Sequence, residues 1–342
     1  MSEAEFRAKR RQKFLTEKYF GLNGASIERS LGNKLLVLKQ DAEVQEVDPS
    51  TQGALFTNKL KLLRLHYTAG APIESLQPLF ADAMKWFDQW HVAYGIRIQA
   101  LAKESSEELR TDGTPVYFED LFHFQLAIDV VSLGILLGRP DAVRHAAAWL
   151  VRYRGADMLL EALLEKVVAD PNTEVTEFFH EQPYGTLIDA IFTAKTPEQA
   201  SAFVKAYLEG WYKSFDGAPW HDGHLVVTDE YSNYEGYWAF EAAAVCVLYG
   251  INDSSFRDHL VYPKDLADWA REHRVLGMIK PGAGAQALRM RCEAGQPCPQ
   301  TGFWYTPAKL GSRRTFSTGQ KMPEIKDTPW GSTIWYWDEQ QG

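Results

Sequence analysis

Residues 236–266, GYWAFEAAAVCVLYGINDSSFRDHLVYPKDL, decide the fold of this chain. The stretch 236–244 predicts a helix whose alanines let a second helix approach closely. Gly250 ends this helix, because glycine favours the left-handed position after a last turn. An earlier stretch, 122–150, repeats the order of apolar helix, glycine stop, polar cap and second helix, so residues 138–141 match residues 250–253. The repetition predicts stacked helical hairpins.

Apolar residues at three- and four-residue spacing predict further helices on both sides of this stretch. We expect them at 3–18, with a break at Gly21 and Gly24, and at 26–40, 55–67, 73–95, 117–137, 142–153, 159–169, 184–193 and 197–213. Residues 48–53, DPSTQG, are turn formers and predict a loop. Pro140 suits the first turn of a helix that follows the stop at Gly138.

After Val275, glycine, proline and aromatic residues replace the alanine- and leucine-rich helices. Residues 303–306 and 332–337 are rich in strand formers and lie between turn residues, so they predict strands. The predicted class is therefore mainly α, with stacked helical hairpins and a small C-terminal β-rich subdomain. We expect an N-terminal helical extension over 1–72, a helical core over 73–277 and a tail over 278–342 that packs on the core.

The composition is that of a globular protein. The 342 residues are 45% hydrophobic and 24% charged, which argues against disorder. The chain shows neither a secretory signal nor an apolar run long enough for a membrane helix. Three cysteines without a CxxC pair indicate reduced thiols in the cytoplasm, although Cys292 and Cys298 could bridge a small loop.

The net charge of −9 is unevenly distributed. Residues 215–275 contain eleven acidic and four basic side chains, whereas residues 1–40 contain nine basic and four acidic ones. An acidic face repels nucleic acid and attracts basic partners. The charge therefore predicts a basic protein partner, although acids also simply solvate helix surfaces.

The loop His221-Asp222-Gly223-His224 is the strongest chemical candidate. Two imidazoles and a carboxylate this close suit a metal site or an acid–base pair. However, HxxH in a loop has no fixed geometry, and no third ligand follows at a known spacing. The alternative is a surface loop whose polar groups bind a partner. No phosphate-binding loop, dinucleotide fingerprint or nucleophile elbow is present, which favours binding over catalysis.

Residues 236–269 resemble the helical immunity proteins of bacterial polymorphic toxin systems, in particular the polymorphic nuclease immunity (PoNi) type. The shared pattern is a GYW-x-FEAAA helix, a glycine stop with an Asp-Ser cap, and a Tyr-Pro-x-Asp-Leu exit. Residues 206–224 are similar to the family segment that ends in a Trp-Tyr helix and a His-bearing loop. The tail resembles the ending of immunity proteins linked to type VI secretion.

The resemblance implies a cytoplasmic antitoxin without a cofactor, which sequesters a toxin encoded by an adjacent gene. It implies a toxin that is a DNase of the restriction-endonuclease type, whose basic cleft an acidic face can occlude. It implies no membrane or nucleic-acid partner. The alternatives are a metal-dependent hydrolase that uses His221, Asp222 and His224, and an adaptor or chaperone for a secreted effector.

Two sets of residues follow from the acidic loop and the family pattern. The predicted toxin contacts are Asp222, His224, Asp229, Glu230, Tyr231, Tyr234 and Glu235. The residues that match the family pattern and are expected to hold the fold are Trp211, Trp238, Phe240, Glu241, Tyr262 and Pro263. Glu241 stands among apolar neighbours, and an unpaired buried carboxylate is costly, so we expect it to be paired.

Overall fold

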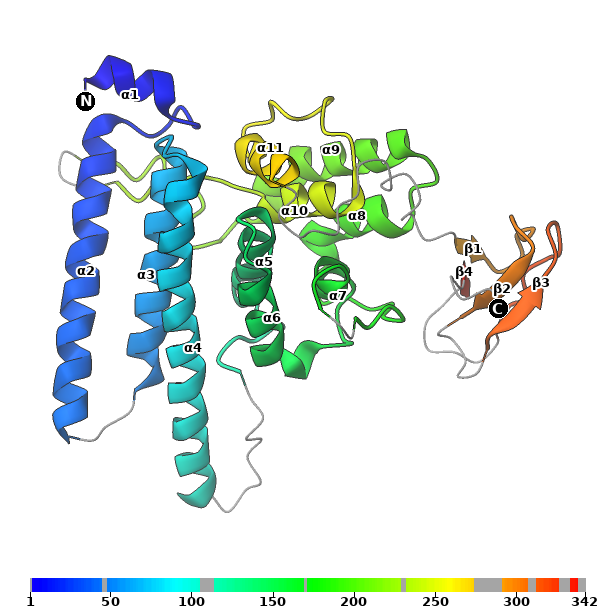
Figure 1. The fold of residues 1–342 in the computed structure, drawn as a ribbon, viewed down its shortest axis with the longest axis horizontal. Helices are drawn as coiled ribbons and strands as arrows, with labels where there is room; N and C mark the ends of the chain where they lie inside the picture. The colour runs from blue at the N-terminus through cyan, green and yellow to red at the C-terminus, as the bar shows by residue number, and fades with distance from the viewer. Residues whose placement is uncertain are drawn as a thin grey trace.

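Helices make up most of the part of the chain that the structure describes. The structure is a computed structural model that describes residues 2–44, 48–104, 114–168, 171–228, 232–273, 291–306, 312–325 and 333–337. The helices are α1 (Glu3–Lys9), α2 (Glu17–Val44), α3 (Pro49–Thr68), α4 (Ile73–Glu104), α5 (Leu121–Leu136), α6 (Pro140–Trp149), η1 (Val151–Tyr153), α7 (Met158–Leu164), α8 (Glu181–Phe192), α9 (Pro197–Ser214), α10 (Phe240–Tyr249) and α11 (Lys264–Glu272). None of these described helices combines the length and apolarity that a bilayer crossing requires. The predicted class, mainly α with a small C-terminal β-rich subdomain, is confirmed (Figure 1).

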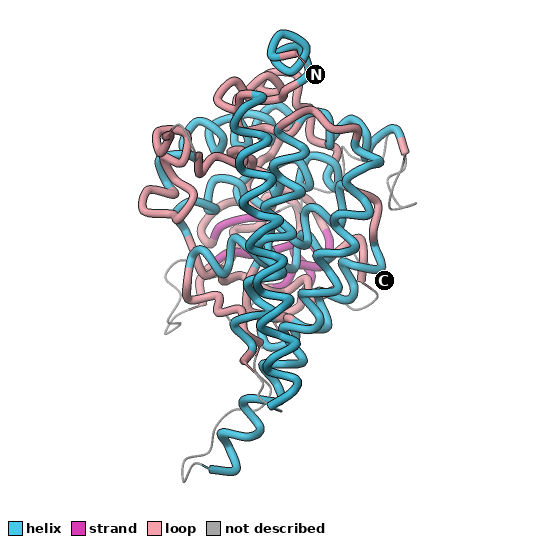
Figure 2. The backbone as a smooth tube through the Cα atoms, turned by 90° about the vertical axis from the view of Figure 1, so that its left-hand side faces the viewer, coloured by secondary structure: helices cyan, strands magenta, loops and turns pink. Residues whose placement is uncertain are grey.

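The long helices α2, α3 and α4 form one side of the molecule, and the shorter helices lie beside them (Figure 1). Figure 2, turned to face that side, shows the long helices in front of the rest. α3 packs against both α2 and α4, and its Leu55, Phe56 and Leu63 are completely buried. Each large apolar side chain that is buried stabilises the folded state by about 1.5–3 kcal/mol. This packing therefore holds the long helices together.

Gly21 and Gly24 do not break the chain, so that prediction is wrong. α1 ends at Lys9, and α2 runs through both glycines. A glycine inside a helix costs only about 1 kcal/mol relative to alanine, and the packing of α2 on α3 offsets this cost. The predicted loop at 48–53 is also wrong, because Asp48 caps α3 and Pro49 occupies its first turn. Both residues favour helix starts as well as turns.

The matched glycine stops are present. Gly138 and Gly250 both have a φ of 65°, in the left-handed region. The helix predicted over 236–244 begins later, at Phe240, because Gly236 has a φ of 119° that no helix contains. α5 packs against α6 and α10, and α10 packs against α11. These contacts are the stacked hairpins that the repeated pattern predicts.

The described strands form one antiparallel sheet in the order β1-β4-β2-β3, with β1 at Arg291–Glu293, β2 at Gly302–Tyr305, β3 at Arg314–Phe316 and β4 at Ile334–Trp337. The strands predicted at 303–306 and 332–337 are thus confirmed to within a few residues. A separate small core of Cys292, Cys298, Trp304, Phe316, Met322 and Trp335 stabilises this sheet. Cys292 and Cys298 are buried free thiols. The domain boundaries predicted from the sequence stay predictions.

Candidate functional site

The loop 215–239 joins α9 to α10 and passes behind α3 toward α2 (Figure 1). Aromatic stacking fixes its start on the helical body. The ring of Trp220 stacks on that of Trp211 with centroids 5.1 Å apart, and Trp220 Nε1 donates to Gln125 Oε1 at 3.0 Å. Because Trp211 is 1% exposed, the loop leaves the body from a rigid base.

Tyr212 on α9 holds the two residues that follow. Its hydroxyl donates to Asp222 Oδ1 at 2.5 Å and accepts from Asp222 N at 3.1 Å. The ring of His221 stacks on Tyr212 at 4.1 Å, and His221 Nε2 donates to the Tyr212 carbonyl at 3.1 Å. Burial and the Asp222 carboxylate raise the pKa of Tyr212, so this hydroxyl keeps its proton and remains a donor.

Asp222 has a φ of 55°, which aspartate tolerates better than most side chains. At Gly223 an added Cβ would lie 2.5 Å from the Asn233 carbonyl oxygen. The turn is therefore closed tightly against residues 232–237, which we call the returning strand of the loop. Aspartate at position 222 and glycine at position 223 therefore suit the backbone of this turn.

His224 belongs to a second polar network. Its Nδ1 lies 2.7 Å from the Tyr237 hydroxyl, and its ring lies 4.5 Å from that of Phe14. Gln12 Nε2 donates to the Tyr237 carbonyl at 2.6 Å, and Gln12 Oε1 accepts from Tyr237 N and from the Tyr234 hydroxyl. This network fastens the loop to the N-terminal segment between α1 and α2.

The geometry of His221 and His224 gives little support to a metal site or an acid–base pair. One nitrogen of His221 is bonded to a carbonyl, and one nitrogen of His224 faces the Tyr237 hydroxyl. Among the described residues, no group of three or more histidine, cysteine or acidic side chains could hold a metal ion. The histidines act here as stacking and hydrogen-bonding groups that shape the loop.

Beyond His224 the loop exposes an apolar tip, which we define as Leu225, Val226 and Val227. These residues are 67%, 49% and 41% exposed. Val227 pairs with Ser232 in an antiparallel bridge, and Tyr19 on α2 donates to the Thr228 carbonyl at 3.3 Å. This tip was not predicted from the sequence. Its signal was a run of strand formers, Leu-Val-Val-Thr, inside an otherwise polar loop.

The structure separates the predicted contacts into surface and interior groups. The Asp222 side chain is 54% exposed, and His224 is half-buried. Tyr234 is 1% exposed, and the Glu235 side chain is 14% exposed with Oε1 3.4 Å from Lys61 Nζ. Tyr234 and Glu235 therefore lie beneath the surface and support the loop. Asp229, Glu230 and Tyr231 lie outside the described residues.

The residues expected to hold the fold are all in the interior, namely Trp211, Trp238, Phe240, Glu241, Tyr262 and Pro263. Trp238 Nε1 donates to Thr68 Oγ1 at 2.9 Å, which joins the GYW segment to α3. Glu241 accepts hydrogen bonds from two side chains of α9. These contacts agree with a structural role.

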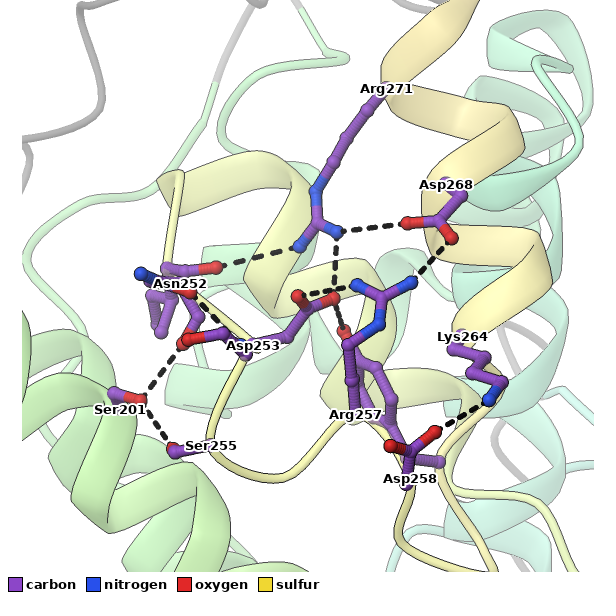
Figure 3. A network of polar contacts seen from close by, with 12 residues as sticks. Ser201, Asn252, Asp253, Ser255, Arg257, Asp258, Lys264, Asp268 and Arg271 are labelled. Carbon is purple, nitrogen blue, oxygen red and sulfur yellow. Dashed lines mark hydrogen bonds and ion pairs between the residues drawn. The ribbon is translucent and has the colours of Figure 1, made fainter.

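An ionic network fixes the segment after α10 (Figure 3). Asp253 is 5% exposed and accepts from Arg257 at 3.0 Å, from Arg271 at 2.7 Å and from the Tyr262 hydroxyl at 2.9 Å. Burial opposes ionisation of Asp253, but Arg271 and the other donors hold its pKa below the ordinary value. The network joins the turn that follows Gly250 to α11.

Comparisons with known proteins match most of the chain. Residues 12–149 match the family model of the N-terminal region of PoNe immunity proteins (PoNi), and residues 155–266 match that of the C-terminal region. The crystal structure of protein PA2201 from Pseudomonas aeruginosa has a similar fold, with a TM-score of 0.60 at 16% identity over 80% of this chain and 95% of that chain. None of the curated proteins matches the chain.

Proposed function

Because this chain belongs to the PoNe immunity protein (PoNi) family, we propose that it binds and neutralises a cognate antibacterial nuclease in the cytoplasm. The toxin is one delivered by type VI secretion and encoded by an adjacent gene. The immunity protein covers the basic cleft through which the nuclease binds DNA. No bond is made or broken by the immunity protein in this scheme.

The observation that carries the proposal is the apolar tip on an acidic loop whose turn is held by hydrogen bonds. Residues 215–230 contain four acidic side chains and no lysine or arginine. Exposed apolar groups that lie next to one another mark interaction sites. In an interface, such groups contribute most of the affinity, while charges at the rim speed association. A basic cleft with an apolar recess is the surface that this loop fits.

The hydrogen bonds at the base of the loop favour tight binding. Tyr212, Gln12 and Tyr237 hold the turn and the returning strand with hydrogen bonds of 2.5–3.1 Å. A loop that is ordered before binding avoids the entropy cost of ordering during association. Because the turn before the tip is already held, less of the loop has to be ordered when the tip binds.

The experiment measures binding to the toxin encoded beside this gene. We expect Leu225→Ser with Val226→Ser to weaken the complex by about 2–3 kcal/mol, roughly 30- to 150-fold in Kd, mainly through faster dissociation. Val151→Ser on η1 is the matched control, since Val151 is 63% exposed and has no exposed apolar neighbour in the sequence. Equal affinity of the double variant and the control would place the interface elsewhere.

A second set of variants separates charge from apolar contact. Asp222→Asn, Asp229→Asn and Glu230→Gln together remove charge while keeping polar side chains. Because rim charges act mainly on encounter, we expect slower association, with the largest effect at low salt, and a nearly unchanged dissociation rate. An association rate that does not respond to these changes at any salt concentration would contradict the acidic-face part of the proposal.

A further inference from the structure

A polar cluster lies in the interior where α5, α8, α9 and α10 meet. Glu241 on α10 is 1% exposed. Its Oε1 accepts from the Tyr207 hydroxyl at 2.5 Å and from Trp211 Nε1 at 2.9 Å. Its Oε2 is buried and has no hydrogen-bond partner among the described residues. One half of this carboxyl is thus saturated with donors, and the other half has none.

Asp129 on α5 has the same asymmetry. It is completely buried, and its Oδ2 accepts from Arg64 Nη2 of α3. Its Oδ1 is buried without a partner among the described residues, as are Ser132 Oγ and the Tyr184 hydroxyl. α5 and α10 pack against each other, and the charge of Asp129 acts on Glu241.

The charges in this cluster do not balance if both carboxyls are ionised. Arg64 is the cation bonded to Asp129. The groups that face Glu241 from α8 and α9 are the neutral Tyr184, Tyr207 and Trp211, and Asp157 adds another carboxyl that acts on Tyr184. A buried carboxylate oxygen without a donor is costly, and a carboxyl next to another buried anion is more so.

We propose that Glu241 stays protonated inside the folded protein and that this proton makes the junction between the two family regions sensitive to pH. Asp129, paired with Arg64, keeps the negative charge at neutral pH, although burial raises the pKa of Asp129 to about 6. Arg64 and Asp129 belong to the N-terminal match (12–149), whereas Tyr207, Trp211 and Glu241 belong to the C-terminal match (155–266). A protonated Glu241 has a hydrogen to donate, and the unpartnered oxygens nearby are acceptors.

The direction of the pH effect follows from the pKa of Glu241 in the folded and in the unfolded protein. Burial, and then the charge of Asp129, raise the pKa of Glu241 from 4.5 to about 8. Because Glu241 binds its proton more tightly in the folded state, this proton stabilises the folded protein fully at pH values below the unfolded pKa of 4.5. That contribution is lost as the pH rises through about 8. The junction is therefore weakest in alkaline solution.

The test compares the pH dependence of unfolding in the whole chain with that of Glu241→Gln, whose amide mimics the protonated carboxyl. Across the interval between the two pKa values, we expect the unfolding equilibrium constant of the unmodified protein to rise by up to the order of a thousandfold from this group. We expect the variant to lack that part of the rise. Equal slopes in the two proteins would overturn the proposal.

The control applies the same substitution to a buried glutamate whose oxygens both have donors. Glu161 is 3% exposed, and its carboxylate accepts from Arg154, Gly155 N and Asn172 N at 2.7–3.0 Å. We expect Glu161→Gln to lower stability while the alkaline loss remains. If Glu161→Gln removed the alkaline loss as completely as Glu241→Gln, the effect would not belong to Glu241, and the proposal would fail.

Infrared spectroscopy of the unmodified protein covers the case in which Glu241→Gln does not fold. We expect the carbonyl stretch of a protonated carboxyl near neutral pH, and we expect it to disappear above about pH 9. In Asp129→Asn the neighbouring charge is gone, so the band should disappear at a lower pH. Absence of the band at neutral pH would overturn the proposal, and an unshifted midpoint in Asp129→Asn would remove Asp129 from it.

Discussion

Replacing Gly236 by alanine should destabilise the protein by about 3–5 kcal/mol. Gly236 has a φ of 119°, and an L residue with a positive φ is strained by about 1–2 kcal/mol. The new Cβ would lie 2.1 Å from Thr68 Oγ1 and 2.4 Å from Trp238 Nε1. Thr68 is completely buried, so neither group can move into solvent.

The clash also breaks hydrogen bonds. Thr68 Oγ1 accepts from Trp238 Nε1 at 2.9 Å and lies within bonding distance of the carbonyl oxygens of Glu235 (2.6 Å) and Arg64 (2.8 Å). Losing two such bonds costs about 1 kcal/mol each, with an added penalty for the buried groups left unpaired. Strain and lost bonds together give the expected range.

Urea unfolding followed by circular dichroism, extrapolated linearly to water, measures this loss. Gly217 is the matched control. Its φ is 86°, and nothing lies within 4 Å of an added Cβ, so Gly217→Ala should cost only the strain of about 1–2 kcal/mol. A Gly236→Ala variant no less stable than Gly217→Ala would refute the reasoning, because it would show that Thr68 and Trp238 yield easily.

Two further predictions concern buried charge and acid. Asp253→Asn should destabilise the protein by about 2–3 kcal/mol in the same unfolding assay, since it leaves Arg257 and Arg271 without their buried partner. A loss under 1 kcal/mol would mean that the network of Figure 3 behaves as a surface pair. His91 is 3% exposed, and burial lowers its pKa from 6.5 to about 4. Between these two pH values, His91 is protonated in the unfolded chain and neutral in the folded chain. Stability should therefore fall by up to about 3 kcal/mol as the pH drops from 6.5 toward 4, and His91→Asn should remove that part of the slope.

Local signals predicted the helices well, because their ends depend on single residues. Gly138 and Gly250 take the left-handed conformation, and Pro140 opens α6. The failures at Gly21, Gly24 and 48–53 have one cause. Glycine also occurs inside helices whose packing offsets its cost, and aspartate and proline also occur at helix starts. The packing of α2 on α3 cannot be recognised from a local sequence pattern.

The candidate site was predicted only in part, because its geometry depends on distant pairs. The sequence identified the loop and the exposed Asp222. It could not show that Tyr234 lies beneath the surface, since the hydroxyl of Tyr234 bonds to Gln12, 222 residues away. The apolar tip was overlooked because strand formers in a loop normally pack inward. Here their exposure becomes visible only when the supporting contacts are known.

Those supporting contacts also join the two matched regions of this chain. The apolar tip and the acidic turn belong to the C-terminal region, but Gln12 and Asn23 of the N-terminal region hold the returning strand, with Asn23 Nδ2 donating to the Tyr234 carbonyl at 2.8 Å. Tyr19 supports the far end of the same loop. A C-terminal region alone would present the same side chains on an unsupported loop, which would have to be ordered during binding at a cost of about 0.5–1.5 kcal/mol per immobilised side chain. In the interface that we propose, α2 and the segment before it therefore contribute to binding by holding the described part of this loop in place.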